Sequence, residues 1–442
     1  MFGTVLGVMT PLLLLGAGIW FGVRLRFFWF LHPRQCFAAI RGAAESGGTS
    51  PGAALSMALA GTLGVGNIAG VATAITAGGA GAVFWMLLGA LLAMGVKYAE
   101  VYLAVRYRRP DGAGRYHGGA MYYIRDGLEA RARTERGRRA ARFAGGIFAF
   151  LCLINALLTG TLVQVRSAAE CVPLPALAFG LLFAAAAIYV TRRGMARAAR
   201  VTSVLIPALC ALYILLSLLI LLPRCSELPA VFARIWRGAW ETRPALGGAA
   251  GLGVSRAIRY GITRGIFSNE AGCGTAPTAH AAANTKSPHH QGCLGIFEVF
   301  ADTVVLCTLT ALVILLYHNG EGADGAALTV AAFSRLCGES FGTWFGRAAQ
   351  LLLRASVVLF AFATVLCQSC YGAQAIRYFT APARARRMYA LLLAAAVLAG
   401  ALISPSLMWR LADSVVCVMT CANVIFLLLL SREVEGYKKR KP

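Results

Sequence analysis

The sequence predicts an all-α polytopic membrane protein. Of its 442 residues, 58% are hydrophobic and only 14% are charged, and the mean hydropathy is +0.68. Soluble domains carry about 25% charged residues. The apolar residues also form continuous segments near the length of about 20 residues that a helix needs to cross a bilayer. These observations favour a bundle of membrane-spanning helices.

We place about 11 transmembrane helices along the chain. The first is read as a retained helix, because no basic segment precedes its apolar run and no convincing cleavage site follows it. The second and the seventh contain the glycine-rich interruptions described below. The predicted spans cover residues 3–23, 53–78, 82–105, 144–165, 174–191, 202–223, 251–281, 293–317, 350–373, 388–404 and 407–430.

The basic residues between the spans predict the orientation of the chain. Loops on one side hold 29 of the 42 lysines and arginines, whereas the opposite loops hold six. Cytoplasmic loops carry the excess of basic residues, so we expect the N-terminus outside and the C-terminus in the cytoplasm. The same bias, with attraction to anionic lipids, explains the net charge of +24. No nucleic-acid partner is needed.

Two predicted helices are interrupted where a membrane helix should be regular. Residues 61–70 read GTLGVGNIAG, and residues 261–274 read GITRGIFSNEAGCG. Each glycine weakens a helix by about 1 kcal/mol relative to alanine. Non-helical backbone in a membrane is tolerated only where protein or a water-filled cavity surrounds it. Two interrupted segments in corresponding halves of a chain indicate the binding site of a secondary transporter.

These motifs, with GGAMYY at 118–123 and APTAHAAA at 276–283, resemble the alanine/glycine:cation symporter family of the amino acid-polyamine-cation superfamily. The resemblance runs from about residue 50 to 430. It implies an inverted five-plus-five repeat of the leucine-transporter type, preceded by one extra helix. The expected division is an N-terminal helix and loop at 1–50, a first repeat at 51–223, a second repeat with outer loops at 224–430, and a basic cytoplasmic tail at 431–442. The outer loops near 224–250 and 318–349 are expected to fold over the site as short helices.

The first interruption is expected to bind substrate and cation. Exposed N–H groups at a half-helix N-terminus favour an anion, so we assign a substrate carboxylate to the backbone of Gly64, Val65 and Gly66. Asn67 would offer its amide oxygen to a cation or to the other interruption. The resemblance also implies that Thr364 completes an all-oxygen sodium site with two backbone carbonyls, those of Ala60 and Leu63. The alternative for this threonine is a bond within its own helix.

The second interruption is expected to form the other side of the substrate site. Phe267, Ser268 and Asn269 would line it, and the resemblance adds Gln164, for which an interhelical hydrogen bond is an equal alternative. Glu270 needs a partner in the membrane, and Arg264 is the expected one. Further expectations are an ion pair between Lys97 and Glu100, which are spaced i,i+3, and two acids of open use, Asp302 and Asp413.

The chain departs from the family pattern at several positions near this site. Where relatives read Trp-Ser-Tyr-Tyr-Gly-Glu, this chain has Gln368-Ser-Cys370-Tyr-Gly-Ala373. Arg166 adds positive charge near the outer side, and a Pro-Asn pair has become Ala422-Asn423. Gln368 is assigned to the substrate site, where it changes the size and polarity of the pocket. The departures leave the identity of the substrate open.

The resulting hypothesis is symport of a small neutral amino acid, alanine or glycine, with sodium by alternating access, in a bacterial or archaeal plasma membrane. Alternatives are coupling to protons, a glutamine-type substrate, and an amino acid sensor that does not transport. An enzyme is not expected, because the spacing of His280, His289 and His290 fits no catalytic metal template and no dinucleotide fold surrounds the glycines. We expect no cofactor and no metal beyond sodium. The oligomeric state stays open, with a monomer as one alternative.

Overall fold

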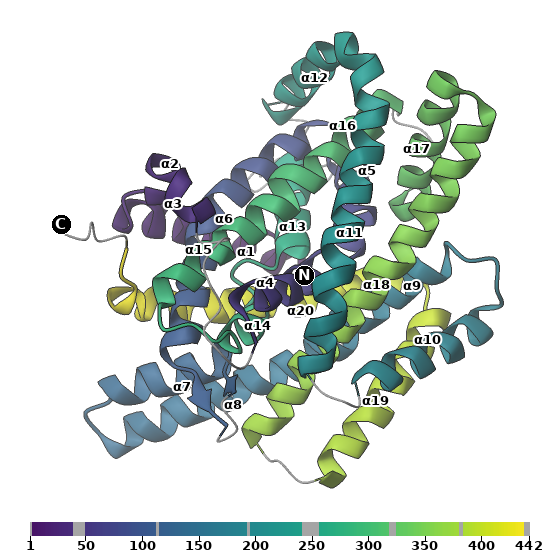
Figure 1. The fold of residues 1–442 in the computed structure, drawn as a ribbon. Helices are drawn as coiled ribbons and strands as arrows, with labels where there is room; N and C mark the ends of the chain where they lie inside the picture. The colour runs from purple at the N-terminus through teal and green to yellow at the C-terminus, as the bar shows by residue number, and fades with distance from the viewer. Residues whose placement is uncertain are drawn as a thin grey trace.

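The computed structural model is a helical bundle (Figure 1). It describes residues 2–38, 49–111, 115–191, 195–240, 256–317, 324–379 and 383–436. Within these ranges the only strands form a short antiparallel hairpin, β1 (Arg109–Pro110) and β2 (Tyr116–His117). Residues 251–255 of the seventh predicted span and 437–442 of the predicted tail lie outside the description.

Among the residues that the structure describes, eight helical segments are long and apolar enough to cross a membrane, and a ninth is added if one bent pair counts as a single span. Two of them contain a π-helical stretch, where the helix widens by one residue per turn. The segments are α1 (Phe2–Arg24); α6 (Gly81–Arg106); α8 (Glu135–Leu157) with π-helix η3 (Leu158–Val163) and α9 (Gln164–Ala169); α11 (Met195–Leu221) with η4 (Leu222–Glu227) and α12 (Leu228–Trp240); α15 (Pro288–Val299) with π-helix η5 (Phe300–Cys307) and α16 (Thr308–Tyr317); α18 (Thr343–Phe379); α19 (Ala383–Leu402); and α20 (Pro405–Leu429).

Two predicted spans do not meet that length and apolarity. The span at 174–191 is the shorter apolar helix α10 (Ala176–Thr191). The span at 251–281 consists of α13 (Arg256–Asn269) and α14 (Pro277–Ala281), which a loop separates. The number of eleven spans therefore stays a prediction. The remaining helices are α2 (Phe28–Leu31), α3 (Pro33–Ala38), α7 (Ala120–Arg131), α17 (Gly325–Phe341) and η6 (Ser431–Glu433).

The bent pair is the first predicted interruption. Helix α4 (Pro51–Thr62) and the segment Val65–Gly78 meet at an angle of 57°. Proline in the first turn and the Ser50 side chain, which accepts the N–H of Ala53 at 3.1 Å, favour the start of α4. Beyond the break lie the 3-10 turn η2 (Val65–Asn67) and helix α5 (Ala69–Gly78).

Helix α6 packs against α1, α13 and α15 (Figure 1). Helix α12 leaves α11 at the top of the view and packs on the start of α6. A Cβ on Gly81 would lie 2.1 Å from the carbonyl carbon of Gly238. The backbones of α6 and α12 can therefore approach this closely because glycine stands at both positions. Small residues permit such close contacts between membrane helices. Side chains such as Val204 and Leu391 are more than 70% exposed on the outside of the bundle, as expected of a lipid-facing surface.

Candidate functional site

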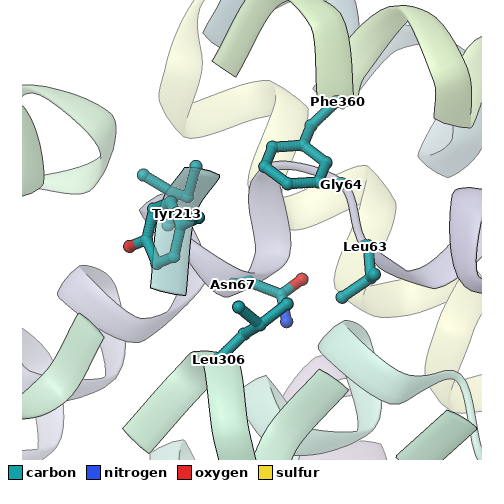
Figure 2. A pocket seen from close by; sticks show the side chains of 7 residues that line it. Leu63, Gly64, Asn67, Tyr213, Leu306 and Phe360 are labelled. Carbon is teal, nitrogen blue, oxygen red and sulfur yellow. The ribbon is translucent and has the colours of Figure 1, made fainter. Parts of the chain in front are cut away.

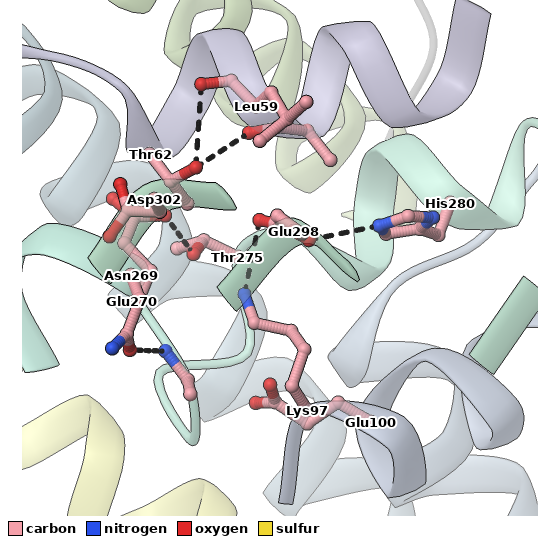
Figure 3. A network of polar contacts seen from close by, with 12 residues as sticks. Leu59, Thr62, Lys97, Glu100, Asn269, Glu270, Thr275, His280, Glu298 and Asp302 are labelled. Atoms are coloured by element: carbon pink, nitrogen blue, oxygen red, sulfur yellow. Dashed lines mark hydrogen bonds and ion pairs between the residues drawn. The ribbon is translucent and has the colours of Figure 1, made fainter. Parts of the chain in front are cut away.

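The first interruption exposes a short stretch of irregular backbone inside the bundle. Helix α4 ends at Thr62, whose hydroxyl donates to the carbonyls of Ala58 and Leu59 (Figure 3). The chain then turns at Gly64, with φ −104° and ψ −148°, and forms a single 3-10 turn before α5 begins. The regular backbone hydrogen bonding of the α-helix is therefore interrupted between residues 63 and 68. Every residue in this stretch is buried.

Two polar side chains converge on Gly64 from neighbouring helices. Gln164, the first residue after π-helix η3, accepts the N–H of Val65 at 3.0 Å through its Oε1. A Cβ on Gly64 would lie 2.5 Å from this oxygen and 2.8 Å from the hydroxyl of Thr364 on α18. The structure thus brings together Gly64, Val65, Gln164 and Thr364. The Gln164 amide occupies the N–H at which a substrate carboxylate is expected.

The hydroxyl of Thr364 donates to the carbonyl of Phe360 at 3.0 Å, which is the within-helix bond set out as its alternative. Ala60 and Leu63 are buried on the α4 side of the break. A shared sodium site of these three residues stays a prediction.

Asp302 joins the two interruptions. It lies in π-helix η5 and is fully buried. Its Oδ1 accepts the amide of Asn67 at 2.8 Å, and its Oδ2 accepts the hydroxyls of Ser268 and Thr303, each at 2.7 Å. Asn269 donates to the Thr303 hydroxyl at 3.1 Å. Residues from both broken segments therefore donate to one carboxylate. This role of Asp302 cannot be read from the sequence, where it is a single acid among apolar residues.

The two breaks are also in direct contact. A Cβ on Gly66 would lie 3.2 Å from the Cα of Ser268 and 3.4 Å from the Phe267 ring. Gly66 thus allows the first break to lie against the end of α13. Phe267 itself packs on Trp409, with ring centroids 5.1 Å apart.

The loop between α13 and α14 is the second interruption, and polar side chains hold its backbone. Glu270 has a φ of 49°, in the left-handed region that a non-glycine residue rarely adopts. Its carboxylate accepts the Thr275 hydroxyl and, at 2.9 Å, the amide of Gln368. Asn269 accepts the N–H of Ala271 at 3.0 Å. Gln368 therefore contacts the second break rather than the first.

The expected pairing of Glu270 with Arg264 is wrong. Arg264 donates to Asp413 on α20 at 2.7 Å and lies 4.4 Å from the Trp409 ring centroid. Arg264 lies within α13, whereas Glu270 follows the end of that helix with a φ of 49°, so helical spacing does not bring the two side chains together. Thr275 and Gln368 are the partners of Glu270 instead.

The expected ion pair between Lys97 and Glu100 is also wrong. Lys97 pairs with Glu298 on α15 at 3.2 Å, and Glu298 also contacts His280 Nε2 at 3.0 Å (Figure 3). The i,i+3 spacing places Lys97 and Glu100 near each other, but each side chain finds a better partner on another helix. Glu100 accepts the N–H of Gly274 at 2.9 Å and the amide of Asn423 at 2.6 Å, so it supports the second break.

A small cavity adjoins the first break (Figure 2). It is lined by Leu63, Gly64, Asn67, Ile68, Tyr213, Leu306 and Phe360. The space open to the centre of a water-sized molecule is about 10 Å³, which is about the room that one water needs. The buried Oδ1 of Asn67, a lining residue, has no hydrogen-bond partner among the described residues. This conformation is closed around the break, so an amino acid enters only after side chains move.

The predicted outer loops are partly helical, and one of them reaches the site. Helix α17 packs on α5 and α18, and its Thr329 donates to the carbonyl of Ile68 at 3.0 Å. This hydrogen bond holds the first residue after the 3-10 turn. Residues 241–250 and 318–323 of these loops lie outside the described part of the chain.

Helices interrupted inside a membrane bundle, joined at a buried polar cluster, define a transporter-like class of membrane protein. A sequence profile described as the sodium:alanine symporter family matches residues 2–440. The chain belongs to this family. Its members are transporters, so the protein is not an enzyme.

Curated relatives cover almost the whole chain. The chain is 34% identical to the sodium/alanine symporter AgcS of Methanococcus maripaludis, over 97% of this chain and 92% of the relative. It is 32% identical to the probable sodium/glutamine symporter GlnT of Bacillus subtilis, over 97% and 87%. An uncharacterized transporter of Haemophilus influenzae is 36% identical, over 97% and 93%.

The fold is similar to a solved structure of a mutant manganese transporter from Eremococcus coleocola. The TM-score is 0.50 at 15% sequence identity, and the match covers 87% of this chain and 76% of that one. This similarity concerns the fold alone. It places the arrangement of helices among known transporter folds.

Proposed function

We propose that the protein takes up a small neutral amino acid together with sodium by alternating access. The observation that carries the proposal is the junction of the two interrupted segments, where Asn67 and Ser268 share the Asp302 carboxylate. A change at either break is transmitted to the other through this carboxylate. Family membership supports the same function.

In this proposal the substrate carboxylate binds the backbone of Gly64, Val65 and Gly66. The N–H of Val65 becomes available when the Gln164 amide moves away. An anion at this position gains from the positive end of the α5 half-helix. Phe267, Ser268 and Asn269 lie on the opposite side, where Gly66 contacts the end of α13.

The sodium ion binds oxygen atoms that surround the same break. The proposed ligands are the carbonyls of Ala60 and Leu63, the hydroxyl of Thr364 and the amide oxygen of Asn67. In the described part of the chain this Asn67 oxygen is buried without a hydrogen-bond partner, as an oxygen awaiting a cation would be. Hard cations prefer such uncharged and carboxylate oxygens.

The architecture in this proposal is eleven spans in an inverted five-plus-five repeat, preceded by the helix α1. The N-terminus faces outside and the basic loops face the cytoplasm. Rocking of the helices that contain the breaks would expose the site to one side and then to the other. The protein would lie in a bacterial or archaeal plasma membrane.

The test is uptake of labelled alanine into proteoliposomes with an inward sodium gradient, compared with a potassium gradient. We expect sodium-dependent accumulation in the wild type and a loss of it in Asn67→Ala. The control is Ser203→Ala, which removes an exposed hydroxyl bonded to its own helix. Equal uptake in both gradients, or an Asn67→Ala variant with unchanged sodium dependence, would contradict the proposed coupling.

Proton coupling is the second candidate, and Glu270 is the observation that favours it. This buried carboxylate lies in the second break, and the partners found for it, Thr275 and Gln368, are neutral donors. Under a pH gradient without sodium, uptake that Glu270→Gln abolishes would establish this alternative. Binding of an amino acid without any uptake would instead indicate a sensor.

A further inference from the structure

A cluster of arginines and aromatic rings lies outside the site described above, on the side of the basic loops. We call it the Tyr122 cluster. Its members come from the short β-hairpin, from α7 and from the last turn of α18. They are Arg109, His117, Tyr122, Arg125, Arg377 and Tyr378.

The Tyr122 ring is the common contact of the cluster. Its centroid lies 5.6 Å from that of His117 and 5.3 Å from that of Tyr378. The guanidinium carbons of Arg109 and Arg125 lie 5.8 Å and 5.4 Å from the same centroid. The hairpin register places Arg109 opposite His117, so both lie on one face of the hairpin. Aromatic faces attract cations, so the ring holds two arginines near each other in spite of their like charge.

Packing of three helices fixes these side chains in place. A Cβ on Gly145 of α8 would lie 2.5 Å from the Tyr378 hydroxyl and 2.9 Å from the Cβ of Arg125. The glycine therefore lets α7 and α18 meet over α8. Arg125 and Tyr378 are positioned by the bundle itself.

Positive charge exceeds negative charge in the cluster. Its three arginines share one carboxylate, Asp126, which pairs with Arg125 at 2.7 Å and with Arg109 at 3.2 Å. Arg377 is exposed, and the described residues offer it no hydrogen bond or ion pair. The cluster therefore carries a surplus of positive charge that an anion would neutralise.

Two buried nitrogen atoms of the cluster lack hydrogen-bond partners within the described residues. These are Nη2 of Arg125 and Nδ1 of His117. A guanidinium nitrogen only donates, so the partner missing at Arg125 is an acceptor. Burial, together with the charges of Arg377 and Arg109, lowers the pKa of His117. The ring is therefore neutral near pH 7, and one of its nitrogens donates.

Exposed apolar side chains adjoin the cluster on the outside of the bundle. Phe379 directly follows Tyr378 at the end of α18 and is 54% exposed, and Phe143 on α8 is 71% exposed. A Cβ on Gly146 would lie 3.6 Å from the Phe379 ring, so α8 and α18 contribute to one apolar surface. In a membrane protein such a surface faces lipid, and arginines at the end of a span lie at the level of the headgroups.

The geometry points to the Tyr122 cluster as a binding site for the phosphate group of an anionic phospholipid. Guanidinium groups bind phosphate oxygens through parallel N–H bonds, which supplies the acceptor missing at Arg125. The acyl chains extend along Phe379 and Phe143. General attraction of basic loops to anionic lipids needs no particular residue, whereas this site needs Arg125 and Arg377. The inference goes beyond the proposed function and does not depend on it.

The test is calorimetric titration of the purified full-length protein in detergent with three probes. Dihexanoyl phosphatidylglycerol is the anionic lipid. Dihexanoyl phosphatidylcholine has the same chains and a phosphate but no net charge, and inorganic phosphate has no chains. In the wild type we expect phosphatidylglycerol to bind at least about ten times more tightly than either of the others, the ratio that one charge-assisted hydrogen bond supplies.

Three variants assign this binding to the cluster. Arg125→Gln and Arg377→Gln should each lower the affinity for phosphatidylglycerol by about tenfold or more. Arg133→Gln is the matched control, since it removes the same charge from an exposed arginine between α7 and α8, and it should bind like the wild type. Phosphatidylglycerol should also raise the unfolding temperature of the wild type and of Arg133→Gln, because a ligand of the folded state stabilises it.

Arg377→Gln keeps the test decisive if Arg125→Gln folds poorly, because Arg377 is exposed and its loss breaks no ion pair within the described residues. Its unfolding temperature without lipid should equal that of the wild type. Equal affinity for the two lipids would overturn the inference. Inorganic phosphate that binds as tightly as phosphatidylglycerol would refute the assignment to a lipid. An equal loss of affinity in Arg133→Gln and Arg377→Gln would show diffuse attraction and refute the site.

Discussion

Substitution of Gly64 by alanine tests the first break directly. Its φ is negative, so the left-handed region is not involved, and the expected effect is one of space. The new Cβ would lie 2.5 Å from Oε1 of Gln164, and ordinary contact begins at 3.4 Å, so the amide must retreat by 0.9 Å. The hydrogen bond to Val65, now 3.0 Å long, is then lost.

The expected size of the effect follows from that one hydrogen bond. A buried N–H left unpaired costs about 1–3 kcal/mol. The folded protein is destabilised by this amount if no water replaces the amide. If the substrate carboxylate binds at the N–H of Val65, the added methyl group also lowers the affinity for substrate. A loss of about 1–3 kcal/mol in binding free energy corresponds to about 5- to 150-fold in affinity.

Thermal unfolding in detergent and the concentration dependence of uptake measure the two effects. Gly70→Ala is the matched control, because a Cβ at Gly70 meets nothing within 4 Å. The double variant Gly64→Ala/Gln164→Ala should lose less free energy of unfolding than the two single variants together. The alanine at position 164 leaves room for the new methyl group at position 64. Additive costs, or a Gly64→Ala variant that behaves like Gly70→Ala, would refute this account of the break.

Two further outcomes concern other parts of the molecule. Lys97→Met should destabilise the protein by about 3–5 kcal/mol, because it leaves the fully buried Glu298 without its 3.2 Å partner. Arg335→Met, which breaks an exposed pair, should leave the unfolding temperature nearly unchanged in the same assay. Burial and the neighbouring Glu433 carboxylate raise the pKa of Tyr107, just beyond α6, from 10.0 to about 12. The folded phenol therefore keeps its proton at a pH where the unfolded one has lost it, so its contribution to stability is complete below about pH 10 and declines between about pH 10 and 12. Unfolding temperatures across this range should fall more steeply in the wild type than in Tyr107→Phe, and parallel curves would contradict the prediction.

The sequence alone predicts the class of fold and the location of the breaks. Long apolar segments require helices in a bilayer, and glycines at 61–70 and 261–274 make those helices locally unfavourable. These are local properties, set by residues close together in the chain. The glycines place Gly64 and Val65 in the first break, and the resemblance adds Gln164, for which an interhelical hydrogen bond is the alternative. The structure shows a hydrogen bond of that kind, from the N–H of Val65 to Gln164.

Only the tertiary structure decided which polar groups pair with one another. Spacing along the chain suggested Arg264 for Glu270 and Glu100 for Lys97, but the partners are Gln368 and Glu298, which come from other helices. A buried charge takes the donor that packing brings within about 3 Å, and helix packing joins residues hundreds of positions apart. The role of Asp302 was hidden for the same reason, because its partners converge on it only when both broken segments fold against η5.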